Sequence, residues 1–172
     1  MAKSIRLEIL KALTKHLEGI TRVNGYDHDL DGQVYRGKSF HSEKLDGKPV
    51  LSLIEPKATD FGVYADEEGT FRRDTWVILL QGWAQSDVKN PTDPVYELLA
   101  DVEMRLSDIV AKDPNNPNKP LWPAIHNLGG LVAGMKLSQP IVRPPEEGLS
   151  DRAFFYMPIR FTLASDITQP GR

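Results

Sequence analysis

Three aspartates alternate early in the chain, at Asp27, Asp29 and Asp31, and Gly32 follows them. Carboxylates at this spacing before a glycine turn are how an EF-hand calcium loop begins. Such a loop needs a bidentate acid at its twelfth position and a helix after it. Lys38 occupies that position, and the residues before it look extended. We therefore predict a polar turn, with a weak calcium site at the three aspartates as the alternative.

No other part of the sequence has the spacing of a known catalytic or cofactor site. The chain has no cysteine, which excludes disulfides, thiolate catalysis and cysteine-ligated metals. The four histidines lack metal-ligand spacing, and there is no Gly-x-Ser-x-Gly nucleophile elbow. The glycines at 129–134 precede a predicted strand, whereas those of a phosphate-binding loop follow one. The prediction is a protein with no enzyme activity, no cofactor and no resident metal.

A nucleic-acid surface is a further alternative in the middle of the chain. Basic and aromatic residues interleave there, as base stacking with phosphate contact requires: Lys57, Phe71, Arg72, Arg73 and Trp76. Acidic residues lie among them and cancel most of the positive field: Asp66, Glu67, Glu68 and Asp74. The net charge of −3 also gives no attraction to nucleic acid or to an anionic membrane. We therefore expect no specific binding of DNA.

The 172 residues are enough for a single domain, 1–172, with 165–172 as a loose tail. No apolar run approaches the roughly 18–20 residues that span a bilayer. The N-terminus lacks the apolar core of a signal peptide, so we expect synthesis in the cytoplasm and no membrane partner.

Two amphipathic helices are predicted from apolar residues at helical spacing. The first begins after Ser4, ends near Gly19 and has an apolar stripe made of Ile5, Ile9, Leu10, Leu13 and Leu17. The second begins at Asp93 and Pro94, with a stripe made of Val95, Leu98, Leu99, Val102, Leu106 and Ile109. Its outer face is expected to carry two ion pairs, Asp101 with Arg105 and Asp108 with Lys112.

Strands are predicted at 49–56, 74–85, 131–142 and 152–164, with short ones near 34–36 and 62–64. The strand at 74–85 is apolar on both faces, so both faces should be covered, by helices or by a partner. Pro158 removes a backbone donor from the last strand, which favours an edge strand or a bulge. Four prolines make 113–123 an irregular, exposed loop. The predicted fold is α+β, a mostly antiparallel sheet with two main helices packed on it, in the order helix, strands, helix, two strands.

Four stretches, in this order, resemble tail terminators, the tail-completion proteins of long-tailed bacteriophages. "VYRGKSF" (34–40) and "LDGKPVLSLIEP" (45–56) are similar to an Arg-Gly turn and a proline-led strand of that family. "TWVILLQGWAQSDVKNPTDPVYELLADV" (75–102) is similar to its central strand and helix, and "QPIVRPPEEGLSDRAFFYMPIRFTLASD" (139–166) to its two last strands. The resemblance covers most of the chain and includes no catalytic motif.

The resemblance implies a virion structural protein at the head-proximal end of the tail, made in the host cytoplasm. Members of the family form a hexameric ring that caps the tail tube, ends its polymerisation and offers a surface for head joining. The implied partners are further copies of the chain, the major tail tube protein and the head-completion or connector protein, with DNA passing through the ring. A neck protein is the alternative within the virion, and a calcium-modulated binding module is the alternative from another class.

Ring assembly suggests two groups of candidate site residues. An edge strand at 154–161 could join neighbouring subunits by extending the sheet. The interface candidates are Trp76, Trp83, Phe154, Tyr156, Pro158 and Arg160. An ordinary two-sided core fits Trp76, Trp83 and Phe155 at least equally well. A lumen that lets DNA pass favours acidic residues, and the candidates are Asp66, Glu67, Glu68, Glu146 and Glu147, which equally fit solvated turns.

Overall fold

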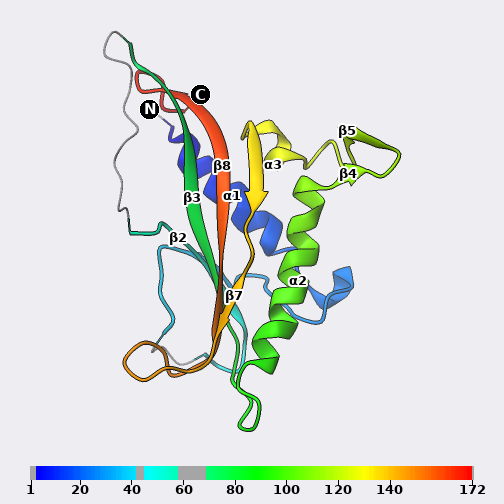
Figure 1. The fold of residues 1–172 in the computed structure, drawn as a ribbon, viewed down its shortest axis with the longest axis vertical. Helices are drawn as coiled ribbons and strands as arrows, with labels where there is room; N and C mark the ends of the chain where they lie inside the picture. The colour runs from blue at the N-terminus through cyan, green and yellow to red at the C-terminus, as the bar shows by residue number, and fades with distance from the viewer. Residues whose placement is uncertain (1–2, 42–44, 58–68, 172) are drawn as a thin grey trace.

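The computed structural model describes residues 3–41, 45–57 and 69–171, and only the backbone of residues 72–74. The described residues form a six-stranded sheet, a small hairpin and three helices, one of them a single turn (Figure 1). The elements are α1 (Ile5–Leu17), a 3-10 turn (Arg22–Asn24), β1 (Val34–Arg36), β2 (Val50–Ile54), β3 (Phe71–Trp83), α2 (Asp93–Val110), β4 (Lys112–Asp113), β5 (Asn116–Pro120), α3 (Asn127–Gly130), β6 (Gly134–Leu137), β7 (Ile141–Arg143) and β8 (Phe154–Asp166). None of the helices in these residues is long and apolar enough to cross a membrane.

The sheet has the strand order β1-β2-β3-β8-β6, and β7 pairs with β8 beside β6. β1 and β2 are parallel, and every other neighbouring pair is antiparallel. The predicted α+β class, with a mostly antiparallel sheet and two main helices, is therefore confirmed. The short strand predicted at 62–64 lies outside the described residues.

Both main helices lie where the apolar periodicity placed them. The Ser4 hydroxyl accepts a hydrogen bond from the Leu7 amide at 3.3 Å and so caps α1. Ile9, Leu13 and Leu17 are its buried stripe. In α2 every apolar residue of the predicted stripe is buried: Val95, Leu98, Leu99, Val102, Leu106 and Ile109.

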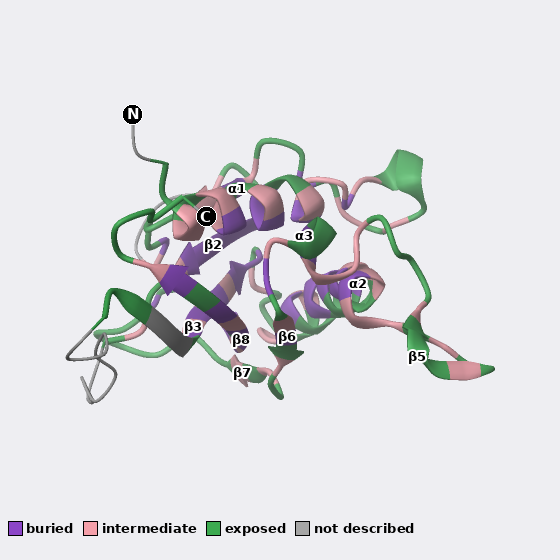
Figure 2. Cartoon of the chain, turned by 90° about the horizontal axis from the view of Figure 1, so that it is seen from above, coloured by how far each residue is buried: buried purple, intermediate pink, exposed green. Residues whose placement is uncertain are grey.

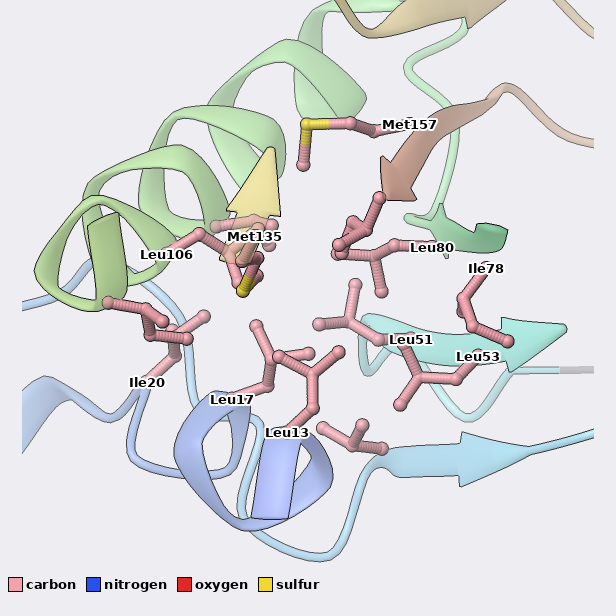
Figure 3. Packing of buried hydrophobic residues seen from close by; sticks show 14 of the residues in the cluster. Leu13, Leu17, Ile20, Leu51, Leu53, Ile78, Leu80, Leu106, Met135 and Met157 are labelled. Carbon is pink, nitrogen blue, oxygen red and sulfur yellow. The ribbon is translucent and has the colours of Figure 1, made fainter. Parts of the chain in front are cut away.

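α1 and α2 cover the same face of the sheet, where they form the main core. Figure 3 shows Leu13 and Leu17 of α1 pointing toward Leu51 and Leu53 of β2, with Leu80 of β3 beside them. Alternate residues of β3 and β8 face this layer and are buried: Trp76, Ile78, Leu80, Phe155, Met157, Ile159, Phe161 and Leu163. Figure 2 shows the helices gathered on one side of the long strands.

The second face of β3 was also predicted to be covered, by helices or by a partner, and the described residues of the chain itself cover only one end of it. There Phe40, Val50, Trp83 and Phe154 form a second, smaller buried cluster. The Trp83 and Phe154 rings stack with centroids 6.3 Å apart, and the Phe40 ring lies 5.5 Å from Trp83. Further along this face, Val77 and Leu79 are partly exposed, and no described helix packs on them.

The last strand is interior, so the prediction of an edge strand is wrong. β8 pairs with β3 along its whole length, from Phe154 opposite Trp83 to Asp166 opposite Phe71. Its other side pairs with β6 and β7. A free edge for sheet extension is thus absent from 154–161 within the described chain.

Pro158 lies at a point of this interior strand where the lack of a backbone N–H donor has little effect on strand pairing. Its carbonyl accepts from the Ser138 amide at 3.0 Å, so its nitrogen also faces the β6 and β7 side. Pairing is interrupted at that point, because β6 ends opposite Ile159 and β7 begins opposite Tyr156. A proline within a strand predicts either an edge strand or a bulge, and here it accompanies an irregularity in strand pairing. The irregularity divides the strand predicted at 131–142 into β6 and β7.

Two further segments are more ordered than predicted. The proline-rich loop forms the hairpin of β4 and β5, which projects from the body in Figure 1. The C-terminal tail is not loose over its described part. Ser165 and Asp166 extend β8, and the Pro170 carbonyl accepts from the Ile5 amide at 2.7 Å. The end of the chain is therefore fastened to the start of α1.

Gly82 gives a first testable prediction about this fold. A Cβ atom at this position would clash with the ring of Phe155 and would lie 2.9 Å from Leu51 Cδ2. Both residues are fully buried. We expect Gly82→Ala to lower the free energy of unfolding by about 1–3 kcal/mol through overpacking, measured by urea denaturation. Gly134→Ala in β6 is the control, because its Cβ would meet Thr162 at an ordinary 3.6 Å, and equal losses would contradict the explanation.

Candidate functional site

The loop that contains the three aspartates is fastened to helix α2 by a buried carboxylate. Asp101 Oδ2 accepts from the amides of Asp27 and His28, both at 3.0 Å, and lies 2.8 Å from His28 Nδ1. Asp101 is 6% exposed. The predicted outer-face pair of Asp101 with Arg105 is therefore wrong, and Arg105 instead lies 3.7 Å from Asp108.

The aspartate side chains themselves do not converge on a common point. Asp29 accepts from the Arg22 amide at 2.9 Å, and Asp27 and Asp31 are exposed. The segment that follows is β1, where an EF-hand needs a helix. Within the described residues, no three histidine, aspartate or glutamate side chains are grouped to hold a metal ion. The geometry is that of a turn anchored from α2.

The interface candidates divide into a buried group and an exposed group. Trp76, Trp83 and Phe154 are at most 5% exposed and belong to the two cores. The core alternative therefore fits Trp76 and Trp83, as well as the fully buried Phe155, and Phe154 is a core residue too. Tyr156 and Pro158 are partly exposed, and Arg160 is exposed. These last three alternate along β8, so they share the second face of the sheet, the face away from the helices.

We call this second face, beyond the aromatic cluster, the open face. Cross-strand neighbours place Ile54, Leu79 and Pro158 in one row and Val77, Arg160 and Lys136 in the next. Further partly or fully exposed residues on this face include Phe71, Thr75, Thr162 and Ile141, with Tyr156 at its boundary with the aromatic cluster. It combines an apolar centre with the positive charges of Arg160 and Lys136.

Helix α2 presents a second unusual surface, which sequence reasoning missed. Its exposed residues are Asp93, Tyr96, Glu97, Ala100, Glu103, Met104 and Ser107. Tyr96 is 58% and Met104 51% exposed, and Ala100 lies between them at helical spacing. The charged residues among those exposed are all acidic. The helical spacing that identified the buried stripe could also have identified this exposed stripe from the sequence.

The acidic lumen candidates are only partly described. Asp66, Glu67 and Glu68 lie outside the described residues. Glu146 and Glu147 are exposed in the turn between β7 and β8. Arg143 Nη2 lies 2.8 Å from Glu146 Oε2, so part of the negative charge of this turn is already compensated.

A groove lies between α1, α2 and α3. Its lining is Ala12, Lys15, His16, Arg105, Ala124, Ile125, Leu128 and Gly129. His16 Nε2 donates to the Arg105 carbonyl at 2.7 Å, and Arg105 Nε donates to the His16 carbonyl at 2.8 Å. These reciprocal bonds join α1 to α2, which gives His16 a structural role at this groove.

His16 makes the stability of the fold depend on pH. Burial lowers the pKa of His16 below its usual 6.5, although the bond to the Arg105 carbonyl opposes this. The unfolded chain therefore takes up the proton more readily, and the stabilisation is complete above pH 6.5 and lost as the pH falls below it. We expect His16→Gln to flatten the fall in unfolding free energy between about pH 7.5 and about pH 5.5, measured by urea denaturation. An unchanged slope would contradict this. Burial also lowers the pKa of His41, so part of the slope should remain.

No protein-family model matches the sequence. A search of curated proteins also finds no match.

Proposed function

We propose that this protein is a tail terminator of a long-tailed bacteriophage, which assembles as a ring on the end of the tail tube and stops its growth. The observation that carries the proposal is the open face of the sheet. A sheet with one face packed on helices and an apolar second face, here Val77, Leu79 and Pro158, is typical of a protein that buries the second face in an assembly.

The four stretches that resemble the family support the choice of assembly. In the fold they supply β1, β2, most of β3 and of α2, β7 and β8, which are all the strands of the sheet except β6, and the helix behind them. The proposed mechanism needs no catalytic residue. A ring seated on the last tube ring occupies the surface that the next tube subunits would use, and its far side meets the head connector.

DNA passes through the proposed ring without being held. A lumen of acidic or neutral character would allow this, and Glu146 and Glu147 are the described candidates for its lining. Because Arg143 compensates the charge of Glu146, Glu147 would contribute more negative charge to the lumen. A ring in which this turn lies on the outer rim would contradict the assignment.

Addition of the purified protein to a polymerising tail-tube protein of the same phage tests the proposal. We expect elongation to stop and negative-stain images to show a ring at one end of each tube. Serum albumin at the same concentration is the control and should leave the tubes growing. Continued elongation in the presence of the full-length, folded protein would contradict the proposed function.

A further inference from the structure

The open face has the composition of a surface that receives a helix. Its centre, Ile54, Val77, Leu79 and Pro158, is apolar and partly exposed. The charged residues at its side, Lys136 and Arg160, are direct cross-strand neighbours, so two positive charges stand together. Helices are the usual cover of a sheet face, and α1 and α2 already cover the opposite face.

The exposed side of α2 has the complementary composition. Tyr96, Ala100 and Met104 form an apolar stripe, and Glu97 and Glu103 beside it are acidic. The buried side of α2 packs toward the sheet, so this stripe points away from it. The stripe and the open face therefore lie on opposite sides of the molecule, and one copy cannot bring its own two surfaces together.

We infer that the exposed stripe of α2 in one copy packs on the open face of the next copy. This contact is the subunit contact of the proposed ring, and it rests on the proposed function because that function requires the chain to self-associate. The apolar stripe covers Val77, Leu79 and Pro158, and the acidic residues of α2 meet Arg160 and Lys136. Each subunit then contributes a helix layer to its neighbour, which completes the second side of that neighbour's sheet.

This contact joins two different surfaces, so it is heterologous. A heterologous contact repeats from copy to copy and closes into a ring when its rotation permits. A symmetric contact of two open faces would bring Arg160 and Lys136 against the same residues, and a contact of two α2 stripes would bring Glu97 and Glu103 against acids. Repulsion between like charges disfavours both symmetric arrangements.

Cysteine cross-linking tests the contact directly, because the chain has no cysteine of its own. The variant Val77→Cys with Ala100→Cys carries one thiol on each surface. With a short bismaleimide reagent, in the presence of tail tubes, we expect a ladder of covalent oligomers on a denaturing gel. Each single variant should give no ladder and no dimer. Dimers from a single variant would show a symmetric contact and overturn the inference.

Charge reversal separates this inference from the proposed function. We expect Arg160→Glu with Lys136→Glu to reduce the cross-linked fraction at least about tenfold, and Glu97→Lys with Glu103→Lys in the partner copies to restore it. Full-length chains that stop tube growth yet give no ladder would overturn the contact and leave the function standing. A ladder without any effect on tube growth would support the contact and contradict the function.

Discussion

Trp83→Ala is expected to lower the free energy of unfolding by about 3–5 kcal/mol, because it empties the centre of the second core. Trp83 is fully buried, between Phe40 and Phe154. A tryptophan that served only a subunit interface would instead leave the stability of the isolated chain unchanged. Urea denaturation of the monomeric protein at low concentration distinguishes the two roles.

Trp122→Ala is the matched control, since the same atoms are removed from a residue that is 50% exposed. A much smaller loss of stability is expected there, within about 1 kcal/mol. Trp83→Phe should also be milder than Trp83→Ala, since it keeps a ring and removes an indole N–H that has no partner in the core. Equal stability losses for Trp83→Ala and Trp122→Ala would contradict the core assignment.

Asp101→Ala is expected to lower the free energy of unfolding by about 3 kcal/mol, because it removes one carboxylate that accepts from three donors. The amides of Asp27 and His28 and the His28 ring would lose their acceptor together. The loop should then open more often. Hydrogen exchange at the Asp27 and His28 amides should accelerate in step with the loss of stability in urea.

Glu103→Ala is the control on the same helix, since Glu103 is exposed and lies on the opposite side from the loop. Its stability should stay within about 0.5 kcal/mol of the wild type. Slow exchange at Asp27 and His28 in Asp101→Ala would mean that the loop is held by other contacts. The aspartate run would then need a different explanation from anchoring by α2.

Periodicity predicted the elements of this fold well, because both helices and β3 bury long apolar stripes. Pro158 shows the limit of such reasoning. A missing backbone donor reveals that a ladder is interrupted, but the sequence does not say on which side of the strand the nitrogen lies. The interruption falls between β6 and β7, and that pairing is long-range. Strand order had to come from the structure.

The candidate site was less predictable than the fold. Trp76 and Trp83 are apolar residues on opposite faces of one strand, and periodicity cannot say which faces a core and which an interface. Asp101 looked like a surface residue of an ion pair, because its true partners, Asp27 and His28, are more than seventy residues away. Surfaces such as the open face depend on which helices cover the sheet, and that is a tertiary property.

Tail length in particles from a phage with this gene disabled tests the central claim most directly. Negative-stain microscopy should show headless tubes far longer than wild-type tails, and the intact gene supplied in trans should restore normal length. Tails of normal length that fail to join heads would contradict a terminator and indicate a connector. Intact, infectious particles would contradict any essential role in tail assembly.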